Sequence, residues 1–580
     1  VSFTLTAEPG FEAVVSGSCE STQEAGADSN ITVVTTAAIW ADCEVSVGFV
    51  SQQSVPFVED DEYHSSQALE QINAAAAYQR GLSGAGVKVG VIDNGLYTDS
   101  VEFYGMDIVG YDFIFDSANY LGTATHGTPV SGLIAGRRNG FGMQGVAYDA
   151  DLVMAVGLVA HINANAIADG FEFMKEQGVR VINNSWGLES FYIDGSKGFA
   201  DVNALESLID QFSLWPAVNA IKDAAADDIV LVFSAGNLGK PDPSVAAGLP
   251  YYYPELPGNF IAVAAVDGSG EIADFSNRCG VIAAWCVAAP GDDVNAPHYS
   301  SNFSNRLSMQ AFSGTSAAAP TVTGVMALLL EQFPWMSGAQ LVSTVLTTAS
   351  NGTNEVLSDI VGRGIIDAGK AINGPAAFEF DFRVDTKGQD GEFSNAISGI
   401  GGLSKLGEGK LTLSGQNDYS GTTTLEEGLL QVDGALSGPT VVEGGTLSGT
   451  GRVATLSVET GVIAPGASAG TLTTGGITLG AAATLDFELS TSTEVGAGVN
   501  DLIAVEGDLT LDGTLRIVTP DTLSFGAYTL ITYSGDLINN GLNLATSVPG
   551  LSFHLTADAG EVKLHVTPAP IPEPEPVVIN

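Results

Sequence analysis

Three residues of this sequence have the side chains that acyl transfer requires: a hydroxyl nucleophile, a base that takes its proton and a carboxylate that orients the base. The chain has only six histidines, and His126 is the one that stands in a segment of small residues, THGTPV. Asp93 ends the apolar run 87–92, and Ser316 lies in the segment FSGTSAAAP. These three residues are therefore the candidates for a hydrolytic site.

Each candidate lies at the end of a predicted element, where side chains can meet a substrate. Asp93 follows a buried strand, and open α/β sheets place their sites beyond the carboxyl ends of their strands. Ser316 opens a predicted helix, whose free amide groups favour developing negative charge. A single aspartate of this kind can simply cap a turn, and a single histidine is usually a surface or core residue. The combination of the three segments favours a site.

The region 66–375 alternates between strand and helix signals, which predicts a mostly parallel sheet with helices on both faces. The predicted strands are 87–92, 179–182, 229–233 and 261–266, and the predicted helices include 66–80 and 318–332. We expect this α/β region to fold without help from the rest of the chain.

The regions on either side have a different texture. Residues 1–65 predict a small β-rich extension, and 376–395 read as a linker. From 396 to 567, short alternating strands punctuated by Gly, Asn and Asp predict a β-solenoid, with a β-sandwich as the alternative. Residues 568–580 form an acidic, Pro-rich tail.

The composition excludes some classes of partner. With 67 acidic and 20 basic residues the formal net charge is −47, so nucleic acid and anionic lipid are poor partners. No apolar run reaches the roughly 18 residues of a membrane span. Clustered carboxylates could hold structural Ca²⁺, but no motif with ligand spacing supports it, and no metal site is predicted.

The four cysteines form two pairs that are near in sequence, Cys19 with Cys43 and Cys279 with Cys286. Four thiols allow three connectivities, of which the near pairing is the simplest. An even, low count without a Cys-x-x-Cys motif fits structural disulfides in an oxidising compartment. The alternative is four buried free thiols. Zinc is not expected, because no histidine flanks either pair at ligand spacing.

Three segments, in this order, resemble the catalytic segments of subtilisin-like serine peptidases: VGVIDNGL, THGTPVSGLIAG and GTSAAAPTVTGVMALLL. In addition, VINNSWG at 181–187 resembles the substrate-binding strand of that family, and FSAGN at 233–237 resembles the segment with its oxyanion asparagine. The resemblance covers roughly residues 66–370. It implies a doubly wound α/β fold and a serine endopeptidase that needs no cofactor for catalysis.

The resemblance also implies a role for each matching residue. Ser316 would be the nucleophile and His126 the general base. Asp93 would orient the imidazole, and the side-chain amide of Asn237 would donate to the oxyanion. Protein or peptide substrates would bind to backbone groups of Ser185, Trp186 and Gly187.

The sequence departs from the family pattern at three places. Asn94 follows the aspartate where the family usually has Thr or Ser, which implies a different set of hydrogen bonds around the site. The segment 188–216 is longer than in a minimal member, and 240–256, with three consecutive tyrosines, is another insertion. These departures bear on substrate preference rather than on the chemistry.

The C-terminal region resembles the passenger stem of autotransporters, above all in the unit LSKLGEGKLTLSGQNDYSGTTTLEEGLLQV. This implies secretion or display at the surface of a Gram-negative-type bacterium. It also implies an outer-membrane β-barrel translocator as a partner, either cleaved off or left out of this chain. Two alternatives to a secreted endopeptidase are a surface adhesin with a vestigial peptidase domain and a peptidase that processes itself or other passengers.

Overall fold

A computed structural model describes residues 57–158, 163–187, 202–299, 308–350, 357–496, 498–519 and 523–570, together with the backbone of five earlier strands. The chain divides into two units, one of residues 1–60 with 78–81 and one of all other residues. Cys19, Cys43 and the predicted tail beyond residue 570 lie outside the described residues. None of the described helices is both long and apolar enough to cross a membrane.

The N-terminal unit consists of short antiparallel strands, in agreement with the predicted β-rich extension. One sheet has the order β1-β4-β3, and β2 pairs with β5. The strands are β1 (Ser2–Thr6), β2 (Phe11–Gly17), β3 (Ser21–Ala25), β4 (Ile31–Thr36) and β5 (Val45–Ser51).

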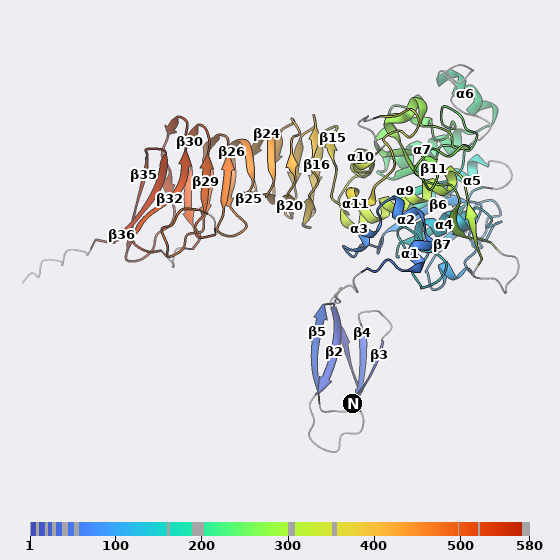
Figure 1. The fold of residues 1–580 in the computed structure, drawn as a ribbon, viewed down its shortest axis with the longest axis horizontal. Helices are drawn as coiled ribbons and strands as arrows, with labels where there is room; N and C mark the ends of the chain where they lie inside the picture. Colours follow the sequence, from blue (N-terminus) through green and yellow to red (C-terminus); the bar gives the residue numbers. More distant parts are fainter. Residues whose placement is uncertain are drawn as a thin grey trace, which may run out of the picture. The chain divides into compact units, whose positions relative to one another are not determined.

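The peptidase-like region is built on a seven-stranded sheet of order β12-β11-β10-β9-β6-β8-β7, in which all neighbouring strands are parallel (Figure 1). The strands are β6 (Lys88–Asp93), β7 (Val109–Asp112), β8 (Asp151–Val156), β9 (Val181–Asn184), β10 (Val230–Ser234), β11 (Phe260–Val266) and β12 (Cys286–Pro290). After β8 the chain crosses β6 and continues on its other side with β9. The sheet is therefore doubly wound, as predicted, with its switch point at β6.

Helices pack on both faces of this sheet. On one face, α5 and α7 bury the sheet residues Ile92, Ile182 and Phe233. Side chains alternate between faces along a strand, so Asp93 points to the opposite face, which α4 and α9 contact. The central helices are α4 (Gly127–Ala135), α5 (Ala164–Glu176), α7 (Trp215–Ala226) and α9 (Thr315–Gln332).

Shorter elements complete the region. They are α1 (Asp61–Ser65), α2 (Ala68–Gln71), α3 (Ala75–Tyr78), α6 (Val202–Gln211), α8 (Leu249–Tyr252), α10 (Gly338–Thr348), α11 (Ala368–Ala371) and the hairpin of β13 (Val294–Pro297) and β14 (Met309–Phe312). The helix predicted for 66–80 is divided into α2 and α3, because Asn73 between them has a positive φ of 56°.

The C-terminal region is a β-solenoid of parallel strands stacked rung upon rung, which confirms the predicted architecture (Figure 1). Its strands include β19 (Leu403–Leu406), β20 (Lys410–Leu413), β22 (Thr423–Leu425), β23 (Leu429–Val432), β25 (Thr446–Gly449), β26 (Arg452–Pro465), β28 (Ile477–Phe487), β29 (Leu502–Val505) and β31 (Thr514–Ile517). One fully buried ladder of aliphatic side chains connects the rungs through Leu411, Leu430, Leu447, Ile463, Leu485 and Leu515. Each rung is thus stabilised mainly by its neighbours.

Antiparallel strands close the far end of the solenoid. Strand β36 (Glu561–Pro568) pairs with both β32 (Gly526–Tyr533) and β35 (Leu551–Asp558). The last rung of a parallel stack has backbone N–H and C=O groups without a neighbouring strand to pair with. An open edge of this kind pairs readily with strands of other chains. The antiparallel strands β32, β35 and β36 therefore form a cap.

The interpretation of 376–395 as a linker is wrong for most of its length. It contains β15 (Ala377–Phe378), β16 (Phe382–Asp385) and β17 (Gly391–Phe393), and the last two pair with stem strands β19 and β20. Phe378, Phe382 and Phe393 are fully buried. The polar residues and the two glycines between these aromatics give the segment the composition of a linker, although it forms the first rung.

This first rung packs directly on the peptidase-like region. The ring centroid of Phe393 lies 5.6 Å from that of Phe333 and 5.8 Å from that of Trp335, just beyond helix α9. The side-chain amide of Gln340 donates to the carbonyl oxygen of Arg383 at 2.9 Å. The α/β region and the stem are therefore joined by a buried aromatic contact, not by a free hinge.

Candidate active site

Asp93 and His126 are in direct contact. The imidazole Nδ1 lies 3.0 and 2.9 Å from the two carboxylate oxygens. Asp93 is fully buried at the end of β6, and His126 immediately precedes helix α4 with its side chain one-third exposed. A buried carboxylate on Nδ1 leaves Nε2 as the ring nitrogen that faces a reacting group.

Asn94 fixes the start of the helix that carries His126. Its side-chain oxygen accepts hydrogen bonds from the backbone amides of His126 (3.1 Å) and Gly127 (3.0 Å). Its amide group donates to the hydroxyl of Thr125 at 3.1 Å. Asn94 thus satisfies two backbone amides at the N-terminus of α4.

Ser316 lies in the first turn of α9. Its elements converge with those of the other two candidates, since α4, α9 and β6 contact one another. Phe312, four residues before Ser316, packs the edge of its ring against His126 with 5.6 Å between centroids. Ser316 is 7% exposed. The fold thus brings together all three candidates from segments that are far apart in sequence.

A chain of hydrogen bonds connects Ser316 to strand β9 and to the middle of helix α9. The hydroxyl of Thr323 donates to the side-chain oxygen of Asn183 at 3.0 Å, and the amide of Asn183 donates to Ser185 Oγ at 2.9 Å. Ser185 Oγ donates to the backbone oxygen of Ser316 at 3.0 Å, and Ser316 Oγ donates to that of Ser185 at 3.1 Å. Asn183 and Thr323 lie in segments that resemble the family, but the sequence analysis predicted no role for either side chain.

Asn237 lies across the same helix terminus. Its side-chain oxygen accepts from the backbone amide (2.8 Å) and the hydroxyl (3.0 Å) of Thr315. Thr315 Oγ1 also accepts from the amide of Gly236 at 3.0 Å. These bonds place the oxygen of the Asn237 amide at Thr315, so the NH₂ group lies on the other side of the amide. Gly314 beside it has φ 149°, a conformation that favours glycine.

The loop that carries Asn237 is held by Asn277, a residue that no sequence signal identified. Asn277 is 1% exposed, and its side-chain oxygen accepts from the amides of Leu238 and Lys240, both at 3.0 Å. Its amide donates to the backbone oxygen of Ala235 at 3.1 Å. It lies 40 residues beyond the loop in an irregular segment, where periodicity gives no information.

The predicted substrate-binding residues directly follow β9, next to Ser316. The indole of Trp186 packs edge-on against Phe233, with 5.4 Å between the ring centroids. Phe233 belongs to the segment that leads to Asn237. Gly187 lies against Ser244, whose hydroxyl would be 3.0 Å from a Cβ at that position. Of the two predicted insertions, residues 188–201 lie outside the described part of the chain. The other forms α8 and buries Tyr252 and Tyr253.

The structure joins Cys279 and Cys286 in a disulfide at the start of β12, with both residues fully buried. Among the residues that the structure describes, no group of three or more His, Cys, Asp or Glu side chains forms a metal site. One buried acidic pair stands apart from the site. Glu102 is fully buried near Glu62, and burial raises the pKa of Glu102 to about 8.

Comparison with known proteins places these segments in two families. Residues 84–364 match the subtilase family, and residues 403–432 match the passenger-associated-transport-repeat. An extracellular serine protease of Serratia marcescens is 31% identical over 71% of this chain and 47% of that protein. The Neisserial autotransporter lipoprotein NalP of Neisseria meningitidis is 31% identical over 77% of this chain and 46% of that protein. The chain thus spans about half the length of these relatives.

A third relative is similar over the α/β region. Subtilisin amylosacchariticus of Bacillus subtilis is 30% identical over 54% of this chain and 74% of its own length. The first rung of the solenoid lies between the two family matches, which end at residue 364 and begin at residue 403.

Proposed function

This chain belongs to the subtilase family, and on that premise we propose that it is a secreted or surface-displayed serine endopeptidase with Ser316 as its nucleophile. The observation that carries the proposal is the contact of buried Asp93 with His126 Nδ1 at 2.9 Å. Asp93 ends strand β6, which contacts the helix α9 that holds Ser316. A serine hydroxyl is a weak nucleophile until a neighbouring base takes its proton.

In the proposed mechanism, His126 Nε2 accepts the proton of Ser316 as Oγ attacks the peptide carbonyl. Asp93 holds the ring in the required tautomer and stabilises the imidazolium that forms. His126 then gives the proton to the departing amine, which leaves an acyl-enzyme. Water repeats the sequence with the same base and releases the acid. Buried Asp93 and the Asn94 bonds keep the ring in one orientation throughout.

The tetrahedral oxyanion needs donors that are already in place. We propose the NH₂ of Asn237 and the backbone amide of Ser316, since Thr315 fixes the oxygen of the Asn237 amide. A donor of this kind contributes about 3–4 kcal/mol, a figure that comes from a subtilisin. The backbone of 185–187 is proposed to bind an extended peptide as an added strand.

The stem supports the proposed location. Its match to the passenger-associated-transport-repeat and the likeness to NalP suggest export by a Gram-negative-type bacterium, with an outer-membrane barrel as the translocator. A buried disulfide fits an oxidising compartment. Proteins or peptides outside the cell are therefore the proposed substrates.

The test compares Ser316→Ala with the unchanged chain on casein and with a fluorophosphonate that labels activated serines. The variant should lose both hydrolysis and labelling while it keeps its melting temperature. Ser343→Ala is the matched control, because Ser343 is also a buried helical serine but belongs to α10. Turnover by pure, folded Ser316→Ala would refute the assignment. A wild-type chain that neither labels nor cleaves would favour the adhesin alternative.

A further inference from the structure

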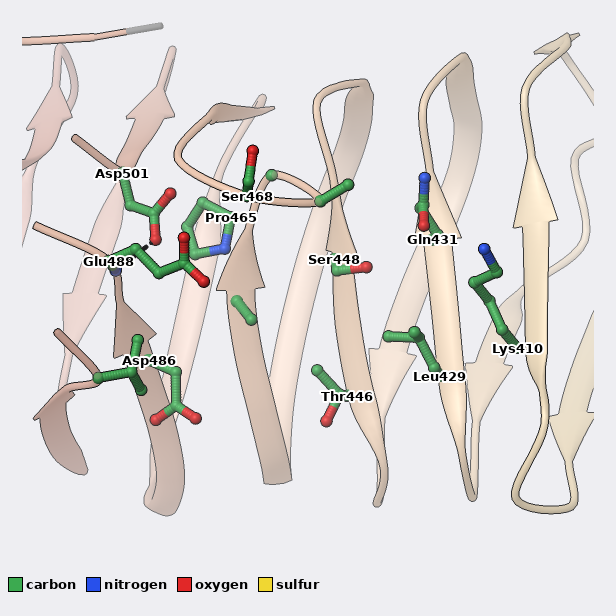
Figure 2. A pocket seen from close by; sticks show the side chains of 14 residues that line it. Lys410, Leu429, Gln431, Thr446, Ser448, Pro465, Ser468, Asp486, Glu488 and Asp501 are labelled. Carbon is green, nitrogen blue, oxygen red and sulfur yellow. Dashed lines mark hydrogen bonds between the residues drawn. The ribbon is translucent and has the colours of Figure 1, made fainter. Parts of the chain in front are cut away.

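A polar groove runs along one face of the solenoid, far along the chain from the proposed active site. It has a volume of about 550 Å³ and lies across strands β20, β23, β25, β26 and β28 (Figure 2). Neighbouring rungs of a sheet are about 4.8 Å apart, so these five strands span about 19 Å. The groove therefore follows the solenoid axis and suits a linear ligand.

The groove is hollow because its floor has small side chains between longer ones. Thr446, Ser448 and Ala464 lie on adjacent rungs in the middle. Longer side chains rise at both ends, with Lys410 and Gln431 on one side and Asp486, Glu488 and Asp501 on the other (Figure 2). The turn from Pro465 to Ser468 forms an upper wall. No aromatic residue lines the groove.

Five polar side chains of the groove have no side-chain hydrogen bond or ion pair among the described residues: Lys410, Thr446, Ser448, Ser468 and Glu488. Ser448 is only 6% exposed, and its hydroxyl points into the groove (Figure 2). A ligand in the groove would therefore find donors and acceptors that no protein group uses.

Other charged side chains of the solenoid form ion pairs or hydrogen bonds, in contrast to Lys410 and Glu488. On the same solenoid, Arg383 pairs with Glu426, and Arg516 pairs with Asp486. Asp501 is 2% exposed and accepts from the amides of Gly470 (2.8 Å) and Glu488 (2.6 Å). Asp501 thus holds the wall of the groove in place, while the carboxylate of Glu488 is left for a ligand.

The lining excludes most classes of ligand. The backbone groups of the floor strands already pair with the next rungs, so a peptide cannot add here as a strand. Leu429 and Val518 are too few to bind a lipid chain. Nucleic acid and acidic polymers are repelled by the carboxylates and by the net charge of −47. Hydroxyl, amide, ammonium and carboxylate groups at successive rungs match the hydroxyls of a sugar chain.

We propose that this groove binds a linear oligosaccharide without negative charge, and that amino sugars bind more tightly than neutral ones. Sugar hydroxyls would hydrogen-bond to Ser448 and Lys410, and a sugar ammonium would pair with Glu488. This binding site goes beyond the peptidase activity and does not depend on it.

The test measures binding by calorimetry with the full-length chain and three probes: a glucosamine hexamer, a cellohexaose and a galacturonic acid hexamer. We expect the glucosamine hexamer to bind with the highest affinity and cellohexaose with a lower one, and we expect no binding of the galacturonic acid hexamer. Glu488→Gln should weaken glucosamine binding about tenfold and bring it to the level of glucose, because only the ionic bond is lost. Ala464→Phe should fill the floor and abolish binding of both sugars.

Glu459→Gln is the matched control, since Glu459 is an exposed carboxylate on β26 outside the groove. It should bind all probes as the unchanged chain does. Far-UV circular dichroism and the melting temperature should be the same in all three variants, which verifies that their solenoids are folded. The proposal fails if neither the glucosamine hexamer nor cellohexaose binds. It also fails if hexalysine binds with the same affinity as the glucosamine hexamer. It also fails if Glu488→Gln and Ala464→Phe leave sugar binding unchanged.

Discussion

The side-chain oxygen of Asn94 lies 3.1 Å from the backbone nitrogen of His126 and accepts its hydrogen bond. The same oxygen accepts from Gly127, so one side chain satisfies two amides at the start of helix α4. Asn94 itself is held by its neighbour, because its backbone amide donates to Asp93 at 2.7 Å. Asp93, Asn94 and His126 therefore form one hydrogen-bonded unit, in which Asn94 is a positioning residue.

Asn94→Ala should lower kcat/KM on the order of tenfold, because a displaced imidazole meets the serine in the wrong geometry. Loss of the cap should also cost about 1 kcal/mol of stability. Asn94→Asp keeps an acceptor oxygen and should retain more activity. Asn163→Ala is the control, because the Asn163 side chain also satisfies an amide at a helix N-terminus, that of Ala166 in α5 at 3.2 Å. Equal losses of activity in both alanine variants would contradict a role for Asn94 beyond stability.

Asn277→Ala should lower kcat more than it raises KM, because the loop that holds Asn237 loses its anchor. The proposed oxyanion contact is made mainly in the transition state, so ground-state binding should change little. The decisive measurement is a double-mutant cycle with Asn237→Ala. The two losses should not add, since both act on one donor. Additive losses would mean that Asn277 acts elsewhere.

Glu102→Gln should stabilise the protein at alkaline pH. The pKa of Glu102 is raised from 4.5 to about 8, mainly by burial. A hydrogen bond from the backbone amide of Met143 lowers this pKa, and the charge of Glu62 contributes to raising it. Because the folded pKa is the higher one, the stabilisation is complete below pH 4.5 and is lost as pH rises through 8. At pH 9 the variant should therefore be more stable by a few kcal/mol, since each pKa unit corresponds to about 1.4 kcal/mol.

Melting temperatures between pH 4.5 and 9 test this prediction. The difference between variant and parent should grow with pH and be small at pH 4.5. Glu176→Gln, at an exposed position of α5, should show no such trend. If the melting temperatures of Glu102→Gln and the unchanged chain changed with pH in parallel, ionisation of Glu102 would not destabilise the fold and the prediction would be wrong.

Removal of the disulfide by Cys279→Ser together with Cys286→Ser should lower stability. The cross-link closes a loop with a sequence separation of 7, for which the chain-entropy relation gives about 2–3 kcal/mol. Denaturant unfolding with and without reductant is the measurement. Reductant should destabilise the unchanged chain more than the variant, in which only Cys19 and Cys43 remain to be reduced. An intact mass that corresponds to four free thiols would contradict the bond.

A chain that ends at Ala376 should be less stable than one that ends at Gly434. The shorter chain loses Phe393 and exposes Phe333 and Trp335, and loss of a buried aromatic typically costs about 3–5 kcal/mol. The longer chain keeps the first rungs and should retain peptide hydrolysis. If both chains melted at the same temperature with equal kcat/KM, the α/β region would be independent of the stem, as its sequence pattern alone suggests.

The sequence by itself identified the residues of the candidate site and the two architectures. Asp93, His126 and Ser316 stand out because their chemistry needs those residue types at the ends of strands and helices. Alternation of strand and helix signals predicted the doubly wound sheet, and Gly-punctuated strands predicted the solenoid. These signals are local: they depend on periodicity over a few residues, which the linear chain displays directly. The triad roles themselves stay a prediction until Ser316 is changed.

Only the tertiary structure decided the contacts between distant segments. Asn277 holds the Asn237 loop from 40 residues away, and Phe393 packs on Trp335 across a segment with the composition of a linker. The groove around Ser448 exists because five rungs place small and long side chains side by side. None of these is encoded in a local pattern, because each depends on which backbone positions the stacked sheet and its helices bring within hydrogen-bonding or packing distance.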